Sequence, residues 1–145
     1  MEKVKLQAQY GLYINGQWRN ASDGATYNAE SPADGSHLAV CAQGSREDVE
    51  AASAAAWEAF KTWKKTTPAQ RAALLNKIAD IIDANKEHLA MVESMDNGKP
   101  IRETMNVDIP MAAEHFRYFA GCILAEEGQA SVLNEQFLSI ILREP

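Results

Sequence analysis

The feature that most constrains the fold is a change in the spacing of apolar residues at Ser45. Before Ser45, short apolar runs alternate with turn pairs such as Asn15-Gly16, and Asn-Gly favours a β-hairpin because it accepts positive φ at both central positions. After Ser45, apolar residues recur every three or four positions, which is the period of an amphipathic helix. The sequence therefore predicts an α/β fold, with a β-hairpin and turn-rich segment over residues 1–44 and helices over residues 45–127.

The first segment is expected to contain two strands that flank Asn15-Gly16 and a third strand later in the chain. Leu12-Tyr13-Ile14 and Gln17-Trp18-Arg19 flank the turn as a hairpin, and residues 37–41 alternate as a further short strand.

Four helices are expected in the second segment. Ser45 with Asp48, and Thr67 with Gln70, have the spacing of a capping box, and Asn85 is a candidate N-cap for a helix over about 86–96. A fourth helix over about 100–126 contains Pro110, which predicts a kink there. The apolar face of the first helix contains Val49, Ala52, Ala56, Trp57, Phe60 and Trp63, that of the second contains Leu74, Leu75, Ile78, Ile81 and Ile82, and that of the fourth contains Met105, Ile109, Ala112, Phe116, Phe119 and Ile123.

A sharp corner separates the third and fourth helices. Gly98 suits the left-handed position just past a helix end, and Pro100 suits the first turn of the next helix. Asp96 lies at the negative end of the third helix dipole, where a carboxylate favours a compensating cation or a turn-capping role beside Lys99.

The last segment, residues 128–145, contains an apolar strand that begins at Phe137 and ends at Leu142. Such a strand needs cover or a partner. It runs directly into residues 143–145, so we expect the chain to be cut from something longer.

Composition excludes several classes of protein. A net charge of −6 argues against a general nucleic-acid surface, and no apolar run is long enough to cross a membrane. Two cysteines without a disulfide framework, and no apolar secretion signal, predict a cytoplasmic protein.

Few residues carry chemistry. No glycine-rich phosphate loop occurs, and His37, His88 and His115 lack metal-ligand spacing. Cys41 and Cys122 have no neighbouring group that lowers a thiol pKa, so both are expected to be buried and inert.

Val107 and Met111 are four residues apart near Pro110. Their periodicity favours the core, although a methionine near a kink can also line an apolar channel.

Taken together, the motifs resemble the amino-terminal segment of an NAD(P)-dependent aldehyde dehydrogenase, most similar to the acetaldehyde-type bacterial subgroup. The motifs that carry the resemblance are Tyr13-Ile14-Asn15-Gly16-Gln17-Trp18, Ser31-Pro32-Ala33-Asp34-Gly35, Arg46-Glu47-Asp48-Val49, Pro68-Ala69-Gln70-Arg71, the stretch 93–100, Asp108-Ile109-Pro110, His115-Phe116-Arg117-Tyr118-Phe119-Ala120-Gly121 and Leu142-Arg143-Glu144-Pro145. They occur in family order over nearly all of the chain after Tyr10. Ser31 departs from the asparagine that the family more often has.

The resemblance implies the helical amino-terminal layer of a Rossmann-like cofactor domain over residues 45–127, followed by the start of an oligomerisation arm over residues 128–145. Family chemistry attacks a short-chain aldehyde with a cysteine thiolate, passes hydride to NAD or NADP and releases the carboxylic acid. The nucleophilic cysteine, the glutamate and the oxyanion asparagine of that family lie beyond Pro145. No catalytic or cofactor-binding residue is therefore expected in this chain, and the chain alone is expected to be inactive.

The roles that the resemblance implies for residues of this chain lie away from the reacting groups. By position in the motifs, Val107 and Met111 correspond to the substrate entrance. Asp96 corresponds to a ligand of a structural cation, held with the backbone carbonyls of Ala29 and Glu30. The strand from Phe137 implies a homo-oligomer, either a dimer or a tetramer.

Two other interpretations stay open. The chain can be a non-catalytic helical assembly module that pairs through its last strand, or a thiol enzyme that uses Cys122. The substrate, the choice between NAD and NADP, and the oligomeric state depend on sequence that is not present here.

Overall fold

The computed structural model describes residues 4–141, which alternate from strands to helices and back to strands. Five short strands come first: β1 (Gln9–Tyr10), β2 (Leu12–Ile14), β3 (Gln17–Arg19), β4 (Thr26–Glu30) and β5 (His37–Ala42). The helical part contains α1 (Arg46–Trp63), α2 (Pro68–Ala84), α3 (Lys86–Asn97), α4 (Ile101–Glu103), the π-helical turn η1 (Thr104–Asp108) and α5 (Ile109–Leu124). The strands β6 (Gln129–Asn134) and β7 (Phe137–Ile141) follow.

The β-rich segment forms a small mixed sheet and a separate hairpin. In the sheet, β5 lies between β1, which runs parallel to it, and β4, which runs antiparallel to it. The hairpin of β2 and β3 confirms the prediction from Asn15-Gly16, since both turn residues have positive φ, 52° and 77°.

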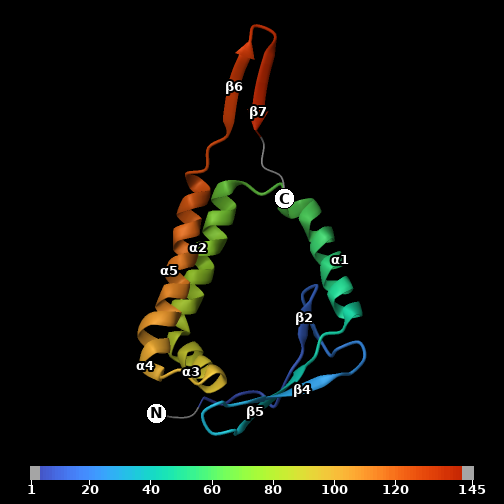
Figure 1. Cartoon of the computed structure of the whole chain (residues 1–145), viewed down its shortest axis with the longest axis vertical. Coiled ribbons are helices and arrows are strands. Elements are labelled where there is room, and N and C mark those ends of the chain that lie inside the picture. Colours follow the sequence, from blue (N-terminus) through green and yellow to red (C-terminus); the bar gives the residue numbers. More distant parts are fainter. Residues whose placement is uncertain (1–3, 142–145) are drawn as a thin grey trace.

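Small residues bring α2 and α5 together as an antiparallel pair (Figure 1). Ala72 and Ala79 of α2, and Ala113 and Ala120 of α5, are all buried, and each pair is spaced by two helical turns. The predicted buried face of α2 is wrong in part. Leu74 and Ile81 remain 43% and 53% exposed, because the close helix contact uses the alanines instead. The packing of α2 against α5 thus depends on alanines, which contribute little to the hydrophobic pattern from which a buried face is predicted.

The predicted fourth helix is divided by a change of backbone geometry. The Ile109 N–H donates to the Thr104 carbonyl, five residues back, which widens the helix into a π turn just before Pro110. Pro110 has no N–H to donate, and its ring would crowd the carbonyl of Asn106 in a regular α-helix. The expected irregularity is therefore present, but it takes the form of a π turn at Thr104–Asp108, and α5 already ends at Leu124.

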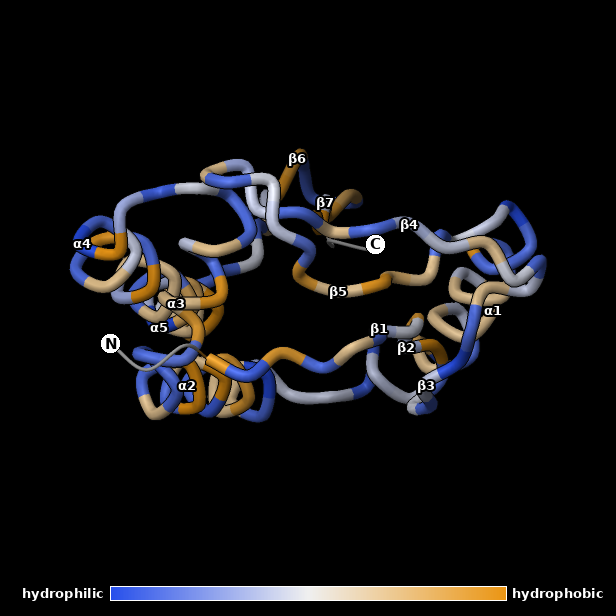
Figure 2. Tube along the Cα trace, turned by 90° about the horizontal axis from the view of Figure 1, so that it is seen from below, coloured by the Kyte–Doolittle hydropathy of each residue, from blue (hydrophilic) through white to orange (hydrophobic). Residues whose placement is uncertain are grey.

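Helix α1 stands apart from the other helices (Figures 1 and 2). Viewed from below, α1 lies at one side and the α2, α3 and α5 group at the other, with β1, β4 and β5 between them (Figure 2). The apolar face predicted for α1 is left open here, since Val49 is 62% and Trp57 is 69% exposed.

The hairpin of β6 and β7 projects away from the rest of the chain (Figure 1). All of its described strand residues except Ser139 are exposed. Among the helices of residues 4–141, none is long and apolar enough to cross a membrane.

Candidate functional site

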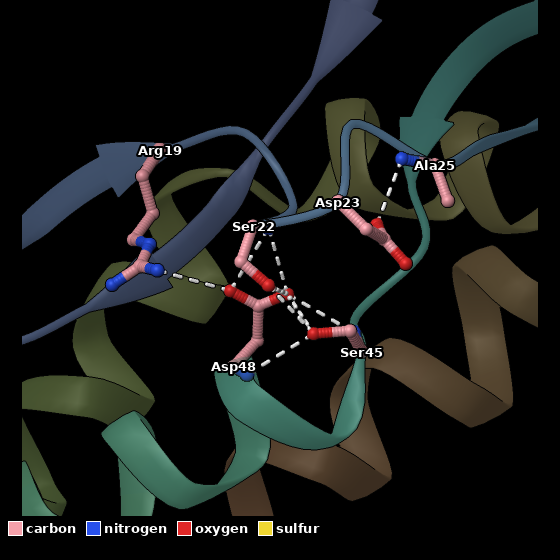
Figure 3. A network of polar contacts seen from close by, with 6 residues as sticks. All are labelled: Arg19, Ser22, Asp23, Ala25, Ser45 and Asp48. Atoms are coloured by element: carbon pink, nitrogen blue, oxygen red, sulfur yellow. Dashed lines mark hydrogen bonds and ion pairs between the residues drawn. The ribbon is translucent and has the colours of Figure 1, made fainter.

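The most heavily bonded carboxylate of the chain is Asp48, in the first turn of α1 (Figure 3). Its side chain is only 2% exposed and accepts hydrogen bonds from Arg19 Nη2 at 3.0 Å and from the backbone N–H groups of Ser22 and Ser45, each at 3.0 Å. The Ser45 hydroxyl accepts from the Asp48 N–H, which completes the capping box that the sequence predicts.

These bonds hold Asp48 ionised. The backbone N–H of Ser45, and then that of Ser22, lower the pKa of Asp48 from 3.8 to about 2. A carboxylate so fully engaged has no role as a general base near neutral pH. Asp48 instead joins the end of β3 and the loop after it to the start of α1. No sequence pattern predicts these partners, because they lie more than 20 residues away.

The corner between α3 and α4 packs against the loop that follows β4. Gly98 has φ +77° and its N–H donates to the Ser94 carbonyl at 3.1 Å, as the sequence predicts for a helix end. A Cβ at Gly98 would lie only 2.9 Å from Pro32 Cγ. Glycine is therefore required twice here, by the left-handed backbone and by the close approach of the loop.

Asp96 lies exposed in the last turn of α3, on this same corner. The pKa of Tyr27 on β4 is raised chiefly by a hydrogen bond with Cys41 across the sheet, and the negative charge of Asp96 is the smallest of its causes. The interpretation of Asp96 as a cap beside Lys99 is not supported, because the Lys99 ammonium pairs with Asp108 at 2.5 Å.

The backbone of β4 is irregular at the two residues that the resemblance implies as partners of Asp96. A β-bulge interrupts the register of β4 between Ala29 and Glu30, and bulges take backbone groups out of the regular ladder. Carboxylate and carbonyl oxygens are the ligands that hard cations prefer. Among residues 4–141, no cluster of three or more His, Cys, Asp or Glu side chains is placed to hold a metal ion, so a cation here would depend largely on carbonyls.

Val107 and Met111 lie on either side of the junction between η1 and α5. They remain 41% and 46% exposed, so in this chain they are surface residues and the core interpretation is wrong. Val107 lies within the π turn, which alters the angular relation that a regular helix would give to residues four apart.

The two thiols are free and differ in surroundings. Cys41 is half-buried on β5, whereas Cys122 on α5 is exposed, contrary to the expectation that both are buried. Cys122 lines a shallow hollow of about 480 Å³ with Phe119 and Ile123, which the solvent-facing side of α5 leaves open.

Comparison with known proteins shows which family this chain belongs to. The family model described as "Aldehyde dehydrogenase family" matches residues 18–145. This chain belongs to the aldehyde dehydrogenase family. A long-chain-aldehyde dehydrogenase from Acinetobacter sp is 46% identical over 143 residues, which is 99% of this chain and 28% of that relative. An acetaldehyde dehydrogenase from Pseudomonas aeruginosa is 42% identical over 98% of this chain and 28% of its own length.

Solved structures of aldehyde dehydrogenases have the same fold in their N-terminal part. The complex of PnpE with nicotinamide adenine dinucleotide has a TM-score of 0.90 and 39% identity, covering 94% of this chain and 28% of PnpE. KauB from Pseudomonas aeruginosa has a TM-score of 0.91 and 32% identity, covering 97% of this chain and 29% of KauB. The α/β fold with its helical layer, hairpin and final strands is therefore that of the family, and the chain spans less than a third of these aldehyde dehydrogenases.

Proposed function

We propose that this chain is the amino-terminal portion of an enzyme that oxidises a short-chain aldehyde to its carboxylic acid with NAD or NADP. The observation that carries the proposal is the family match over residues 18–145. The relatives' names include both acetaldehyde and long-chain aldehydes, so a series of aldehydes of increasing length is the appropriate test. We expect the highest kcat/KM, measured with the enzyme that contains this chain, for the shortest members of the series.

In this proposal the chain supplies scaffold and no reacting group. The family's nucleophilic cysteine forms a thiohemiacetal with the aldehyde, and that cysteine, the glutamate and the asparagine belong to sequence after Pro145. NAD or NADP supplies the hydride acceptor when bound. Neither Cys41 nor Cys122 stands in the family's nucleophile motif, so Cys122→Ser should leave kcat unchanged despite the exposure of that thiol.

The substrate entrance is the second part of the proposal, with Val107 and Met111 on its rim. Their exposure beside the π turn supports a role at a surface rather than in the core. In the enzyme that contains this chain, Met111→Ala should raise KM for the longer aldehydes and leave kcat for acetaldehyde unchanged. Leu124→Ala is the matched control, since Leu124 is also exposed on α5 but lies at its far end. Equal effects of the two substitutions would argue against the entrance.

A structural cation at Asp96 is the third part, held with the carbonyls of Ala29 and Glu30. The exposed carboxylate at a helix C-terminus and the bulge in β4 support it. Its test is thermal unfolding of the enzyme with Na⁺, K⁺ or Mg²⁺: Asp96→Asn should remove any dependence of Tm on these ions. Glu87→Gln, an exposed carboxylate in the first turn of the same helix, should keep that dependence.

The fourth part of the proposal is that the enzyme forms a homo-oligomer, a dimer or a tetramer in the cytoplasm, through residues 137–142. Leu142 lies outside the described residues. The exposure of Leu138 and Ile140, 60% and 59%, on a projecting hairpin supports a subunit contact. Leu138→Asp should lower the molar mass of the enzyme in light scattering, whereas Gln136→Asp in the hairpin turn should not. A non-catalytic assembly module would also respond to Leu138→Asp, but it would show no aldehyde oxidation before the substitution.

A further inference from the structure

The π turn η1 is held at both of its ends by contacts with earlier parts of the chain. At its start, the Thr104 hydroxyl lies 2.9 Å from the Ala90 carbonyl of α3, and Thr104 is fully buried. At its end, Asp108 Oδ2 lies 2.5 Å from Lys99 Nζ. The Lys99 side chain therefore connects the corner between α3 and α4 to the last residue of η1.

The backbone that carries this ammonium group is itself fixed. The Lys99 N–H donates to Asn97 Oδ1 at 2.8 Å, and the next residue is Pro100, whose ring restricts its own φ, here −59°. The hydrogen bond with Asp108 is also the main cause of a raised Lys99 pKa, so the ammonium stays charged at neutral pH. Asp108 is thus held by a full charge on a rigid corner.

Asp108 occupies the one position that adjoins both residues of the proposed entrance. Val107 directly precedes it in η1, and Met111 follows it in the first turn of α5. A π turn directs its side chains differently from an α-helix, so the direction of Val107 depends on how the end of the turn is held. A restraint on Asp108 therefore acts on Val107 before it and on Met111 after it.

The exposure of the ion pair separates an effect on position from an effect on stability. The Lys99 side chain is 49% exposed and that of Asp108 is 23% exposed. Water screens such a pair, which therefore contributes little to the free energy of unfolding. A small free energy is nevertheless enough to change severalfold the population of one local arrangement relative to another. Loss of the pair should therefore alter the end of η1 more than the stability of the enzyme.

We propose that Lys99 is a positioning residue for the substrate entrance: its ion pair with Asp108 fixes the end of η1 and holds Val107 where the alkyl chain of a longer aldehyde contacts it. This inference rests on the proposed function, which assigns Val107 and Met111 to the rim of the entrance. Acetaldehyde carries only a methyl group, whereas the chain of hexanal extends toward the rim. Lys99 thus contributes to the preference among aldehydes of different length.

The test compares kcat/KM for hexanal with kcat/KM for acetaldehyde, in the enzyme that contains this chain. Lys99→Met keeps an unbranched side chain and removes the charge. It should lower the ratio of hexanal to acetaldehyde about three- to fivefold through a higher KM for hexanal, which is the effect of losing contact with about one methylene group. Lys99→Arg should keep most of the parent ratio, because a guanidinium also pairs with a carboxylate.

Two further variants make the test specific. Arg102→Met removes a cation close to the same corner, but Arg102 pairs with Glu103, its neighbour in α4, at 2.8 Å, so the ratio should stay at the parent value. Asp108→Asn should lower the ratio as Lys99→Met does. The double variant should lower it no further, because both substitutions remove the same ion pair.

Three results would overturn this inference while aldehyde oxidation persists: an unchanged ratio in Lys99→Met, an equal fall in Arg102→Met, or additive effects of Lys99→Met and Asp108→Asn. Thermal unfolding separates positioning from loss of structure, since Lys99→Met should have a Tm close to that of the parent, and a large fall in Tm would contradict the positioning role. An enzyme that oxidises no aldehyde would refute the proposed function, and this inference with it.

Discussion

Thr104, the first residue of the π turn, offers the sharpest test of how the corner before the proposed entrance is held. It is fully buried, with 0% exposure. Its hydroxyl lies 2.9 Å from the Ala90 carbonyl and 3.0 Å from Ser94 Oγ. A hydroxyl has one proton, so Thr104 donates to Ala90 and accepts from Ser94. The perturbation is Thr104→Val, which keeps the shape of the side chain and removes both bonds.

The expected magnitude follows from those two bonds. A net contribution of about 0.5–1.5 kcal/mol for each gives a loss of about 1–3 kcal/mol in the free energy of unfolding. Thr104→Ser keeps the hydroxyl and loses one methyl group, which costs about 1 kcal/mol. Valine should therefore be the more destabilising substitution, although it is the more hydrophobic residue.

The assay is urea unfolding followed by circular dichroism, with the same variants in the chain and in an Acinetobacter chimera, in which this chain replaces the matched segment of the Acinetobacter relative. A double-mutant cycle with Ser94→Ala should give a coupling energy of about 1 kcal/mol, because one hydrogen bond joins the two residues. The reasoning is refuted if Thr104→Val is as stable as the parent, or if Thr104→Ser is less stable than Thr104→Val.

Three further predictions concern the contacts that position the elements. Asp48 has a folded pKa of about 2, below its ordinary 3.8, so its contribution to stability is present above pH 3.8 and is lost as the pH falls toward 2. When stability is measured as the urea midpoint at each pH, Asp48→Asn should flatten the curve over that pH range. Gly98→Ala should lower the free energy of unfolding by about 1–3 kcal/mol because of the positive φ, and the contact with Pro32 should add to that loss. Gly128→Ala should cost far less in the same unfolding assay, because a Cβ there meets nothing within 4 Å. Arg117 bridges Asp80 and Asp83 at 2.8 and 2.7 Å but is 40% exposed, so Arg117→Gln should lower the urea midpoint only slightly; a loss of stability that does not shrink in high salt would contradict an ion-pair origin.

Local signals predicted the local structure well. The Asn15-Gly16 turn, both capping boxes and the end of α3 at Gly98 follow from residues within four positions of one another, and all are present. Asn85 is the exception: its side chain donates to the Ile81 carbonyl of α2 and makes no cap bond to α3.

Features that depend on distant parts of the chain were not predictable. The partners of Asp48 come from β3 and the following loop, and the buried Thr104 hydroxyl finds its partner, the Ala90 carbonyl, on α3. Hydrophobic period predicted which residues of α1 share a face, but it carries no information on what covers that face. The exposure of Cys122 is a similar case, since the expectation of a buried thiol rested only on the absence of an activating neighbour in the sequence.

The candidate site was predictable only through resemblance. Val107, Met111 and Asp96 have no pattern of their own that distinguishes them from ordinary core, surface or capping residues. The structure adds that all three residues are exposed.

The rate of NADH formation from acetaldehyde and NAD by the purified 145-residue chain tests the central claim most directly. The Acinetobacter chimera is measured beside it as the positive control. Our account predicts no rate above the enzyme-free blank for the chain, and turnover for the chimera, because the proposed function assigns the reacting groups to sequence outside these residues. Turnover by the pure chain would contradict the account and would direct attention back to Cys122.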